Sequence, residues 1–457
     1  MPLQKNQVLT LRVERLSSDG SGVAHSPDGE TVFIPGAAPD DEARVRIVKD
    51  CKRYAFGILD EVLTPSPDRI PVDCAVAGPC GGCSLRHLDY AAELRAKQEN
   101  VADAFARIGG LDVPVLPIVG SPEVNRYRNK VQFPVGVDKS GKPCIGFYAG
   151  RTHRIVPCPD CRLQPGVLNE IGNALCAFFA EKGIQPYSEE TGRGLVRHIF
   201  LRRGAHSGQI MVCLVCTRAK LPSAEELCTR LKAQFAEITT ILLNVNAKNT
   251  NVILGTETHT LYGPGYIEDT LCGVPVQLGP LSFYQVNTLA AEQLYGIAAQ
   301  YAQLTPDDLL LDLYCGMGTI GLSMAAHCRE LIGVEIVPEA IESAKANAAR
   351  MGADVAAKSR FFCADAGQAA TRLAAEGLHP DIVMLDPPRK GCDEATLSAV
   401  VRMAPRRVVY VSCNPATAAR DAAWLEQNGY HAEKVQPVDL FPRTRHVEAI
   451  VSLQRGI

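Results

Sequence analysis

The sequence of 457 residues contains no long apolar run. No segment approaches the roughly 18 consecutive apolar residues of a membrane-spanning helix, and the N-terminal segment M-P-L-Q-K-N-Q lacks the apolar core of an export signal. Basic residues are not in excess either: the net charge is −3, which excludes a protein that binds nucleic acid mainly by neutralising phosphates. We therefore expect a soluble cytoplasmic protein with no membrane contact and no obligate protein partner.

The chain is too long for one ordinary core and predicts several domains. Residues 1–63 show short alternating strands broken by glycine turns, which is typical of a small barrel of the OB kind. Residues 64–275 follow a proline-rich linker and mix strands with helices. Residues 276–457 alternate strands and helices, which predicts a doubly wound α/β sheet built from βαβ units. The predicted strands of this last part are 309–313, 331–335, 382–385, 408–411 and 446–453.

Most of the 17 cysteines lie singly in apolar stretches, where a thiol behaves as a small core residue. The segment D-C-A-V-A-G-P-C-G-G-C-S is different, because it is rich in glycine and proline and has no core to fill. It supplies Cys74, Cys80 and Cys83 as three soft ligands. A fourth ligand would come from Cys158 or Cys161 in P-C-P-D-C-R. The spacing alone fits a zinc site as well as an iron–sulfur cluster.

A glycine-rich turn marks a nucleotide-type cofactor site. Gly316-Met-Gly-Thr-Ile-Gly321 follows a predicted strand, and Glu335 ends the next one, where its carboxylate can bind ribose hydroxyls. This pattern suits NAD as well as S-adenosylmethionine. Asp312, positioned for an amino group, and the later D-P-P-R segment favour S-adenosylmethionine. Asp365 is placed either to meet an adenine amine or to cap a helix.

Cys413 ends the apolar run V-V-Y-V-S-C and is the candidate nucleophile. A thiolate that adds to C6 of uracil makes C5 nucleophilic enough to accept a methyl group. Glu448, in R-H-V-E-A-I-V, is the candidate base for the C5 proton. Asp386-Pro-Pro-Arg389 carries an arginine where enzymes that methylate amines place an aromatic residue. The combination favours a carbon target.

Several motifs together resemble the RNA (uracil-5-)-methyltransferases. They are F-Y-Q-V-N, D-L-Y-C-G-M-G-T, V-E-I-V, L-D-P-P-R-K-G, V-S-C-N-P-A-T and H-V-E-A-I-V. The resemblance covers the whole chain, with residues 1–63 similar to a TRAM domain. It implies C5 methylation of uridine with S-adenosylmethionine, with Cys413 as nucleophile and Glu448 as proton acceptor. The residues that it implies for cofactor binding are Gln285, Tyr314, Glu335 and Asp386.

The cysteine cluster resembles the iron–sulfur site of the 23S ribosomal RNA branch of this family. This resemblance implies a [4Fe–4S] cluster on Cys74, Cys80, Cys83 and Cys161, with Cys158 as a spare thiol. It also implies 23S ribosomal RNA as the substrate, since the tRNA-specific branch is expected to lack both the barrel and the cysteine cluster. The basic residues expected to contact RNA are Arg126, Arg128, Lys130, Arg197, Arg202 and Arg203.

Two other functions compete with this interpretation. A radical S-adenosylmethionine enzyme also combines a TRAM domain with a cluster, but it needs C-x3-C-x2-C, whereas five residues separate Cys74 from Cys80. A non-catalytic RNA-binding protein with a relic cofactor fold is disfavoured by the intact Cys413, Glu448 and Asp386.

Overall fold

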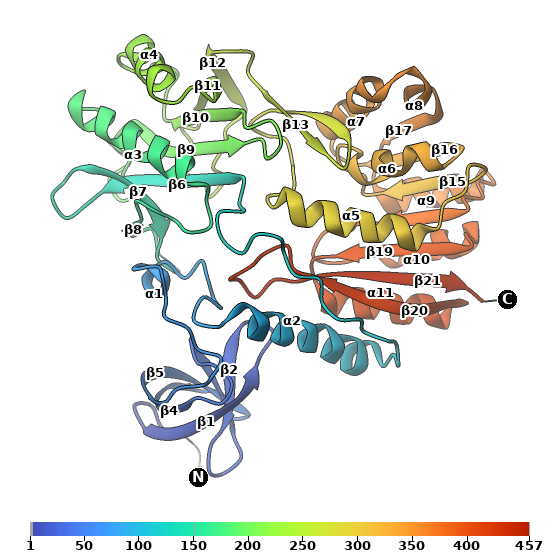
Figure 1. Ribbon diagram of the computed structural model, residues 1–457, viewed down its shortest axis with the longest axis horizontal. Coiled ribbons are helices and arrows are strands. Elements are labelled where there is room, and N and C mark those ends of the chain that lie inside the picture. The colour runs from blue at the N-terminus through green and yellow to red at the C-terminus, as the bar shows by residue number, and fades with distance from the viewer. Residues whose placement is uncertain (1–2, 151, 457) are drawn as a thin grey trace.

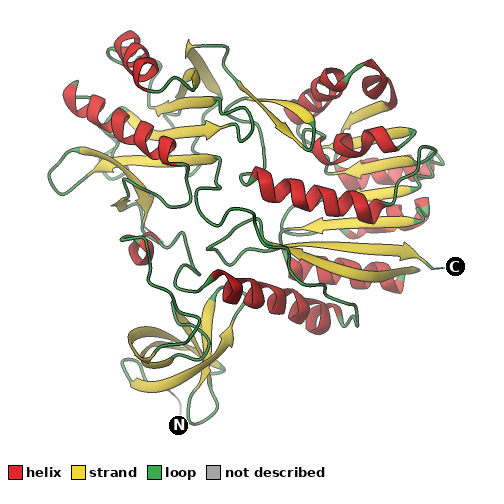
Figure 2. Ribbon diagram, viewed as in Figure 1, coloured by secondary structure: helices red, strands yellow, loops and turns green. Residues whose placement is uncertain are grey.

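The computed structural model describes residues 3–150 and 152–456. Three bodies are visible in it: a small barrel at the N-terminus, a central sheet flanked by two helices, and a large C-terminal sheet with helices on both faces (Figures 1 and 2). The α/β class predicted from the alternation of strands and helices is confirmed. Among the described helices, none is both long and apolar enough to cross a membrane.

The N-terminal barrel is closed in the strand order β1-β2-β3-β5-β4. Its strands are β1 Val8–Leu16, β2 Ser21–His25, β3 Thr31–Pro35, β4 Glu42–Asp50 and β5 Tyr54–Thr64. Inward positions alternate with outward ones, so the barrel interior is filled by aliphatic side chains such as Val13, Ile34 and Val45. The predicted OB-like barrel is therefore confirmed.

The central body is a seven-stranded sheet in the order β12-β11-β10-β9-β6-β7-β8. Its strands are β6 Lys130–Val137, β7 Pro143–Tyr148, β8 Ile155–Pro157, β9 Val196–Arg203, β10 Ile210–Cys216, β11 Ile238–Val245 and β12 Glu257–Tyr262. The helices α3 Gly166–Glu181 and α4 Ala224–Gln234 accompany it, and the hairpin of β13 Ile267–Leu271 and β14 Val274–Leu278 follows. Cys213 and Cys216 are fully buried in β10, as their apolar context predicts.

The C-terminal sheet has the order β17-β16-β15-β18-β19-β21-β20. Its strands are β15 Leu309–Leu313, β16 Glu330–Glu335, β17 Ser359–Cys363, β18 Ile382–Leu385, β19 Arg407–Ser412, β20 Tyr430–Val438 and β21 Glu448–Arg455. The helices are α5 Thr288–Ala302, α6 Thr319–Met324, a 3₁₀ turn Ala325–His327, α7 Pro338–Met351, α8 Ala353–Lys358, α9 Ala366–Ala375, α10 Glu394–Met403 and α11 Pro415–Gln427.

This sheet is mixed. A sheet built from βαβ units alone would have been wholly parallel. The strands β17, β16, β15, β18 and β19 run parallel, but β21 pairs antiparallel with both β19 and β20. The reason lies in the connection: a loop, 439–447, joins β20 to β21, and no crossover helix intervenes. The antiparallel arrangement brings the start of β21 beside the end of β19.

Helix α2, Tyr90–Ala104, extends through a π-helical turn, Phe105–Gly109, and lies against the C-terminal sheet (Figure 1). Val101 and Phe105 belong to the same apolar core as β19, β20 and α11. A short helix, α1 Ala77–Cys80, precedes it within the cysteine segment.

A buried ion-pair network ties α2 to the 439–447 loop. The Lys97 Nζ donates to Glu93 Oε1 and to Asp439 Oδ1, both at 2.8 Å, and to the Phe441 carbonyl at 3.1 Å. Lys97, Glu93 and Asp439 are at most 2% exposed. A buried ammonium is tolerated here because two carboxylates and a carbonyl replace its water shell.

The same loop contains a strained residue that α2 holds in place. Arg443 has a φ of +68°, a left-handed conformation that is costly for a side chain of this size. Its backbone N–H donates to Glu93 Oε1 at 2.7 Å, and its guanidinium donates to the Leu88 carbonyl at 2.8 Å. The Arg443 carbonyl accepts from the Leu85 N–H at 3.1 Å, two residues beyond Cys83. The loop conformation thus depends on residues 85–97.

We expect Lys97→Met to lower the free energy of unfolding by about 3–5 kcal/mol, because it removes the cation that lies 2.8 Å from both buried carboxylates, Glu93 and Asp439. Thermal or urea unfolding measures the loss. Lys345→Met is the matched control, since Lys345 forms an exposed pair with Glu342 at 2.9 Å and should shift the free energy of unfolding by about 0.5 kcal/mol or less. Equal losses in the two variants would contradict the assignment of this network.

Candidate active site

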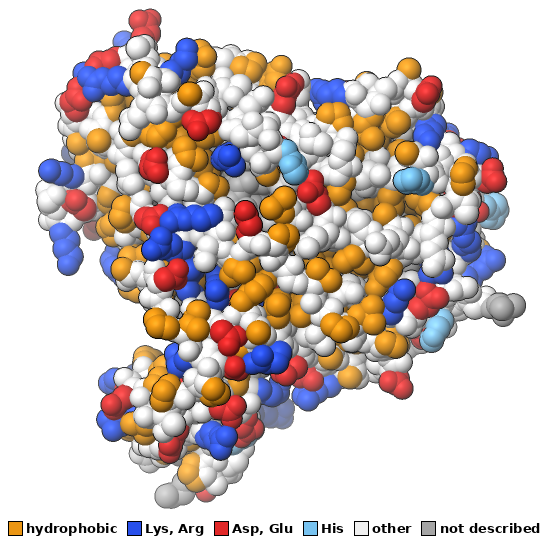
Figure 3. All heavy atoms as spheres, in the orientation of Figure 1, with side chains coloured by type: hydrophobic (Ala, Val, Ile, Leu, Met, Phe, Trp, Pro, Cys, Tyr) orange, Lys and Arg blue, Asp and Glu red, His pale blue; other side chains and the backbone are white. Residues whose placement is uncertain are grey.

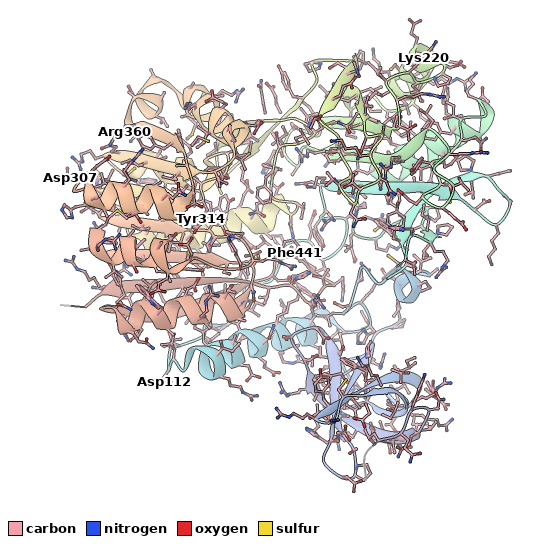
Figure 4. The ribbon with its side chains drawn as sticks, turned by 180° about the vertical axis from the view of Figure 1, so that it is seen from behind. Asp112, Lys220, Asp307, Tyr314, Arg360 and Phe441 are labelled. Atoms are coloured by element: carbon pink, nitrogen blue, oxygen red, sulfur yellow. The ribbon has the colours of Figure 1, made fainter. Side chains whose placement is uncertain are left out.

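A cavity of about 1850 Å³ lies between the central sheet and the C-terminal ends of the parallel strands. Tyr314, at the end of β15, and Phe441, in the 439–447 loop, are labelled in Figure 4. All eleven predicted site residues line this one cavity, although they span residues 74–448. They are Cys74, Cys80, Cys83, Cys161, Gln285, Tyr314, Glu335, Asp365, Asp386, Cys413 and Glu448.

The glycine-rich turn after β15 forms one wall. Tyr314 and Gly316 both adopt positive φ, at +67° and +55°, which folds the chain back sharply before α6. Glu335 Oε2 accepts the Gly316 N–H at 3.2 Å, while Oε1 accepts from Ile336 at 2.8 Å. These bonds fix the Glu335 carboxylate at the end of β16. Because a carboxylate offers about four acceptor positions, room remains for ligand hydroxyls.

Two aspartates near this turn have local structural partners. Asp312 Oδ2 accepts the Gly321 N–H at 3.0 Å, and burial raises the Asp312 pKa to about 8. Asp312 is not among the residues that line the cavity, but its Oδ1 is buried without a hydrogen-bond partner in the described chain, so its contact with an amino group stays a prediction. Asp365 caps α9 by accepting from the Gln368 N–H at 3.1 Å, and its side chain also lines the cavity.

Cys413 lies directly after β19, opposite Glu448. Ser412 pairs with Ala449 in the antiparallel ladder, so the next position places Cys413 across from Glu448. Glu448 is 7% exposed, and burial and the nearby Asp386 raise its pKa to about 8. Burial also raises the Asp386 pKa to about 7. At neutral pH this corner can therefore hold protons on carboxyl groups beside a thiol.

Arg389 supplies the positive charge in this corner. Burial and Glu448 raise the Cys413 pKa, while the Arg389 guanidinium opposes that rise. Arg389 Nη2 donates to His446 Nδ1 at 2.8 Å. Burial and Arg389 lower the His446 pKa to about 4, so the imidazole is neutral and can accept this bond. The role of His446 was missed in the sequence, where the only signal was its place two residues before Glu448.

The loop that carries Arg389 is held by hydrogen bonds to Asn414 and to helix α11. Asn414 Nδ2 donates to the Arg389 carbonyl at 3.0 Å, and the Cys392 N–H donates to Asp421 Oδ2 at 2.8 Å. Asp421, which is 1% exposed on α11, also accepts from the Tyr410 hydroxyl at 2.5 Å. Helix α11 begins two residues after Cys413, so one short segment positions both the thiol and the arginine.

The cysteine segment forms the opposite end of the cavity. Cys158 joins the four predicted ligands there. An interaction with the Cys158 thiol lowers the Cys161 pKa to about 6, and Arg86, 3% exposed, interacts with Cys83 and donates to Asp73 at 2.8 Å. Over the described part of the chain, no three His, Cys, Asp or Glu side chains form a group that could hold a single metal ion.

Three of the basic residues expected to contact RNA have internal partners instead. Arg126 pairs with Asp160 at 2.6 Å, and Arg197 pairs with Glu189 at 2.8 Å. Arg202 is 1% exposed and donates to the carbonyls of Gly279 and Ser282 at 2.8 and 2.7 Å. The sequence could not distinguish these from Arg128, which lines the cavity. Acidic, basic and apolar side chains alternate over the face in Figure 3.

Comparisons with known proteins agree with this geometry. A family model described as tRNA (uracil-5-)-methyltransferase matches residues 206–456, and a TRAM domain model matches residues 2–59. Uncharacterized RNA methyltransferases of Halalkalibacterium halodurans and of Listeria monocytogenes serotype 4b are each 42% identical, over 99% of this chain and 98% of theirs. The Pyrococcus abyssi tRNA (uracil-54, C5)-methyltransferase, solved with S-adenosyl-L-homocysteine, has a TM-score of 0.77 and 26% identity, over 98% of this chain and 100% of that one.

We expect Arg389→Met to slow alkylation of Cys413 by iodoacetamide at pH 8. The cation favours the thiolate, so its loss raises the thiol pKa further, and each unit of rise lowers the thiolate fraction about tenfold. Mass spectrometry of the peptide containing Cys413 gives the rate. Lys390→Met, which removes the neighbouring exposed cation, should change the rate far less; an unchanged rate in Arg389→Met would show that Arg389 does not act on the thiol.

Proposed function

This chain belongs to the tRNA (uracil-5-)-methyltransferase family, whose members methylate uracil C5 in RNA with S-adenosylmethionine, and we propose that it acts on 23S ribosomal RNA through a covalent adduct of Cys413. The observation that carries the mechanism is the position of Cys413, one residue beyond the Ser412–Ala449 pair of β19 and β21, in one cavity with Glu448, Asp386 and Arg389.

The residues present fit S-adenosylmethionine. Gln285, Tyr314, Glu335, Asp365 and Asp386 line the same cavity as Gly316 of the glycine turn, and the Glu335 carboxylate, fixed at the end of β16, would hold the ribose hydroxyls. When bound, the cofactor supplies a methyl group on a positively charged sulfur. The carboxylates of Glu335 and Asp386 favour such a cation in a cavity that otherwise raises carboxyl pKa values by burial.

The proposed reaction uses the thiol and the carboxyl in turn. The Cys413 thiolate, favoured by Arg389, forms a bond to uracil C6, and the electron pair of the C5–C6 double bond moves toward C5 and the C4 carbonyl. C5 then takes the methyl group. Glu448, as carboxylate, removes the C5 proton, the electron pair of the C5–H bond re-forms the C5–C6 double bond, and the C6–S bond breaks to release Cys413 as thiolate. A Glu448 pKa of about 8 is close enough to neutral pH for both receiving and releasing that proton.

The cysteine segment fits an iron–sulfur cluster by its donor set. Four thiols, of Cys74, Cys80, Cys83 and Cys161, line one end of the cavity, and the buried Arg86 guanidinium beside Cys83 compensates negative charge there. A [4Fe–4S] cluster is held by four cysteine thiolates. The cluster would lie at the end of the cavity formed by the cysteine segment, and no step of the methyl transfer passes through it.

The barrel does not distinguish ribosomal RNA from tRNA. The Pyrococcus abyssi tRNA enzyme aligns over 98% of this chain, so the expectation that tRNA-specific relatives lack the barrel is wrong. The resemblance of the cysteine segment to the ribosomal branch is what supports 23S ribosomal RNA. Methylation of a tRNA uridine is the second candidate, favoured by that structural match.

A deletion strain separates the two substrates. We expect 5-methyluridine to disappear from one or two positions of 23S ribosomal RNA and to persist in tRNA. The purified protein should restore it on the deletion strain's ribosomal RNA with S-adenosylmethionine and no added reductant. Loss confined to tRNA would establish the second candidate, and a requirement for a reductant would indicate radical chemistry.

Cys413→Ala and Glu448→Gln should fail at different steps. Cys413→Ala should abolish methyl transfer and attachment to RNA, because C5 is never activated. Glu448→Gln should add and methylate but not eliminate, so a methylated protein–RNA adduct stable to denaturation should accumulate. Gel electrophoresis with a labelled methyl group detects it. Wild-type protein that methylates RNA but forms no adduct with RNA containing 5-fluorouridine would exclude the covalent mechanism.

The cluster ligands are tested by paired serine variants. Purified without oxygen, the wild-type protein should be brown. Cys161→Ser should lose iron and visible absorbance, whereas Cys158→Ser should retain both. The reverse result would show that Cys158, and not Cys161, is the fourth ligand. Stoichiometric zinc without iron would show that the four cysteines form a zinc site.

A further inference from the structure

The barrel carries its aromatic side chains on the outside. Residues 1–64 contain three aromatic residues, Phe33, Tyr54 and Phe56, and all three are in mutual contact. The ring centroids lie 5.8 Å apart for Phe33 and Tyr54, 5.9 Å for Phe33 and Phe56, and 5.6 Å for Tyr54 and Phe56. They come from the neighbouring strands β3 and β5, where Phe33 pairs with Phe56 in register.

The barrel's own packing does not account for this position. Val32, Ile34 and Ala55 point inward and are fully buried, so the alternate residues Phe33, Tyr54 and Phe56 face outward. Tyr54 is 40% exposed, and the other two rings are partly exposed. The outward face of such a strand is normally polar. The described core of the barrel contains no aromatic residue. All three aromatic side chains lie on its outer surface, where a ligand can contact them.

One of the three rings, Phe33, borders a second cavity that reaches the candidate nucleophile. This cavity, of about 830 Å³, is lined by Phe33 on the barrel side and by Cys413 on the opposite side. Arg389, Arg445 and His446 line both this cavity and the one that holds the cofactor residues. The third side is formed by the C-terminal half of α2 and the π-helical turn, from Glu99 to Ile108, and Figure 1 shows α2 next to the barrel. A strand of RNA with its target base at Cys413 would thus extend past Phe33.

Cations accompany the rings. Lys52 and Arg53 immediately precede Tyr54 and are exposed. Across residues 3–150 and 152–456, neither side chain has a recorded hydrogen bond or ion pair, so both are free to meet phosphates. Aromatic faces combined with nearby cations are the usual means of holding unpaired nucleotides. A protein partner would instead need a broad apolar patch, whereas the large apolar side chains exposed on the described barrel are only Val8, Tyr54, Ile58 and Leu63.

We infer that Phe33, Tyr54 and Phe56 form a stacking site for unpaired bases of the RNA that flank the target uridine. The inference rests on the proposed function and adds how the RNA is held. A uridine that leaves its stack to reach Cys413 deprives its neighbours of a stacking partner. Phe33, at the barrel side of the second cavity, and the two rings beside it would replace that partner, so they would favour the RNA conformation in which the target base is extruded.

The test uses a 12-nucleotide single-stranded RNA with 2-aminopurine two positions from a uridine. Stacking on the rings should quench its fluorescence in the wild-type complex. Phe33→Leu, which keeps an apolar side chain but no ring face, should weaken binding about 5- to 100-fold and reduce the quenching. Phe33→Trp should retain both. Lys52→Ala should instead lower the salt dependence of binding, and Phe33→Leu should leave that dependence unchanged.

Val8→Ala is the matched control, because Val8 is a 50% exposed apolar residue on β1, away from the rings. It should bind the RNA as the wild type does, and thermal unfolding checks that each variant is folded. Wild-type affinity and quenching in Phe33→Leu would overturn the proposal. So would a defect seen with ribosomal particles but not with naked RNA, which would indicate a protein partner. S-adenosylhomocysteine binding should not change in any variant. Because the oligonucleotide test needs no methylation, it can succeed or fail independently of the substrate assignment.

Discussion

The Lys97 ammonium joins helix α2 to the loop before β21, and the active site depends on that junction. Asp439 and Phe441 belong to the loop, Glu93 to the helix, and all are held by one buried cation. The loop then supplies Phe441, Arg445 and His446 to the cavity and delivers Glu448 to its place beside Cys413. The strained Arg443 shows that this conformation is imposed by the helix, since the loop's own preferences oppose it.

A second constraint is the charge balance around Cys413. Asp386 and Glu448 lie in one buried corner, so each raises the cost of ionising the other. Arg389 is the cation that offsets them, and its bond to a neutral His446 orients the guanidinium without cancelling its charge. The corner thus places a cation beside the Cys413 thiol and next to two carboxyl groups whose pKa values burial raises to about 7 and about 8. An aromatic residue in place of Arg389 could not serve this purpose.

Local patterns predicted the strands and the cavity residues well, because the βαβ rule places the ends of parallel strands at one edge. The strands 309–313 and 382–385 match the structure residue for residue, and all eleven predicted side chains share one cavity. Contacts between distant segments were beyond this reasoning. Lys97 meets Asp439 across 342 positions, and Arg126 is neutralised by Asp160, 34 positions away; neither pairing leaves a periodic signal in the sequence. The strand β21 was predicted, but its antiparallel direction was not, because the sequence of the loop before it resembles that of any other connection.

The position of Cys413 between two cavities follows from the chemistry it would perform. A thiol that adds to C6 approaches the uracil ring from one face, while the methyl donor must reach the adjacent C5. Cofactor and RNA therefore need separate routes to one point. The C-terminal edge of the parallel strands provides the first route, past Tyr314 and Glu335. The gap between barrel, α2 and α11 provides the second, past Phe33. The connection from β20 to β21 is a loop and not a crossover helix. Cys413, which lies near this loop, therefore lines both cavities.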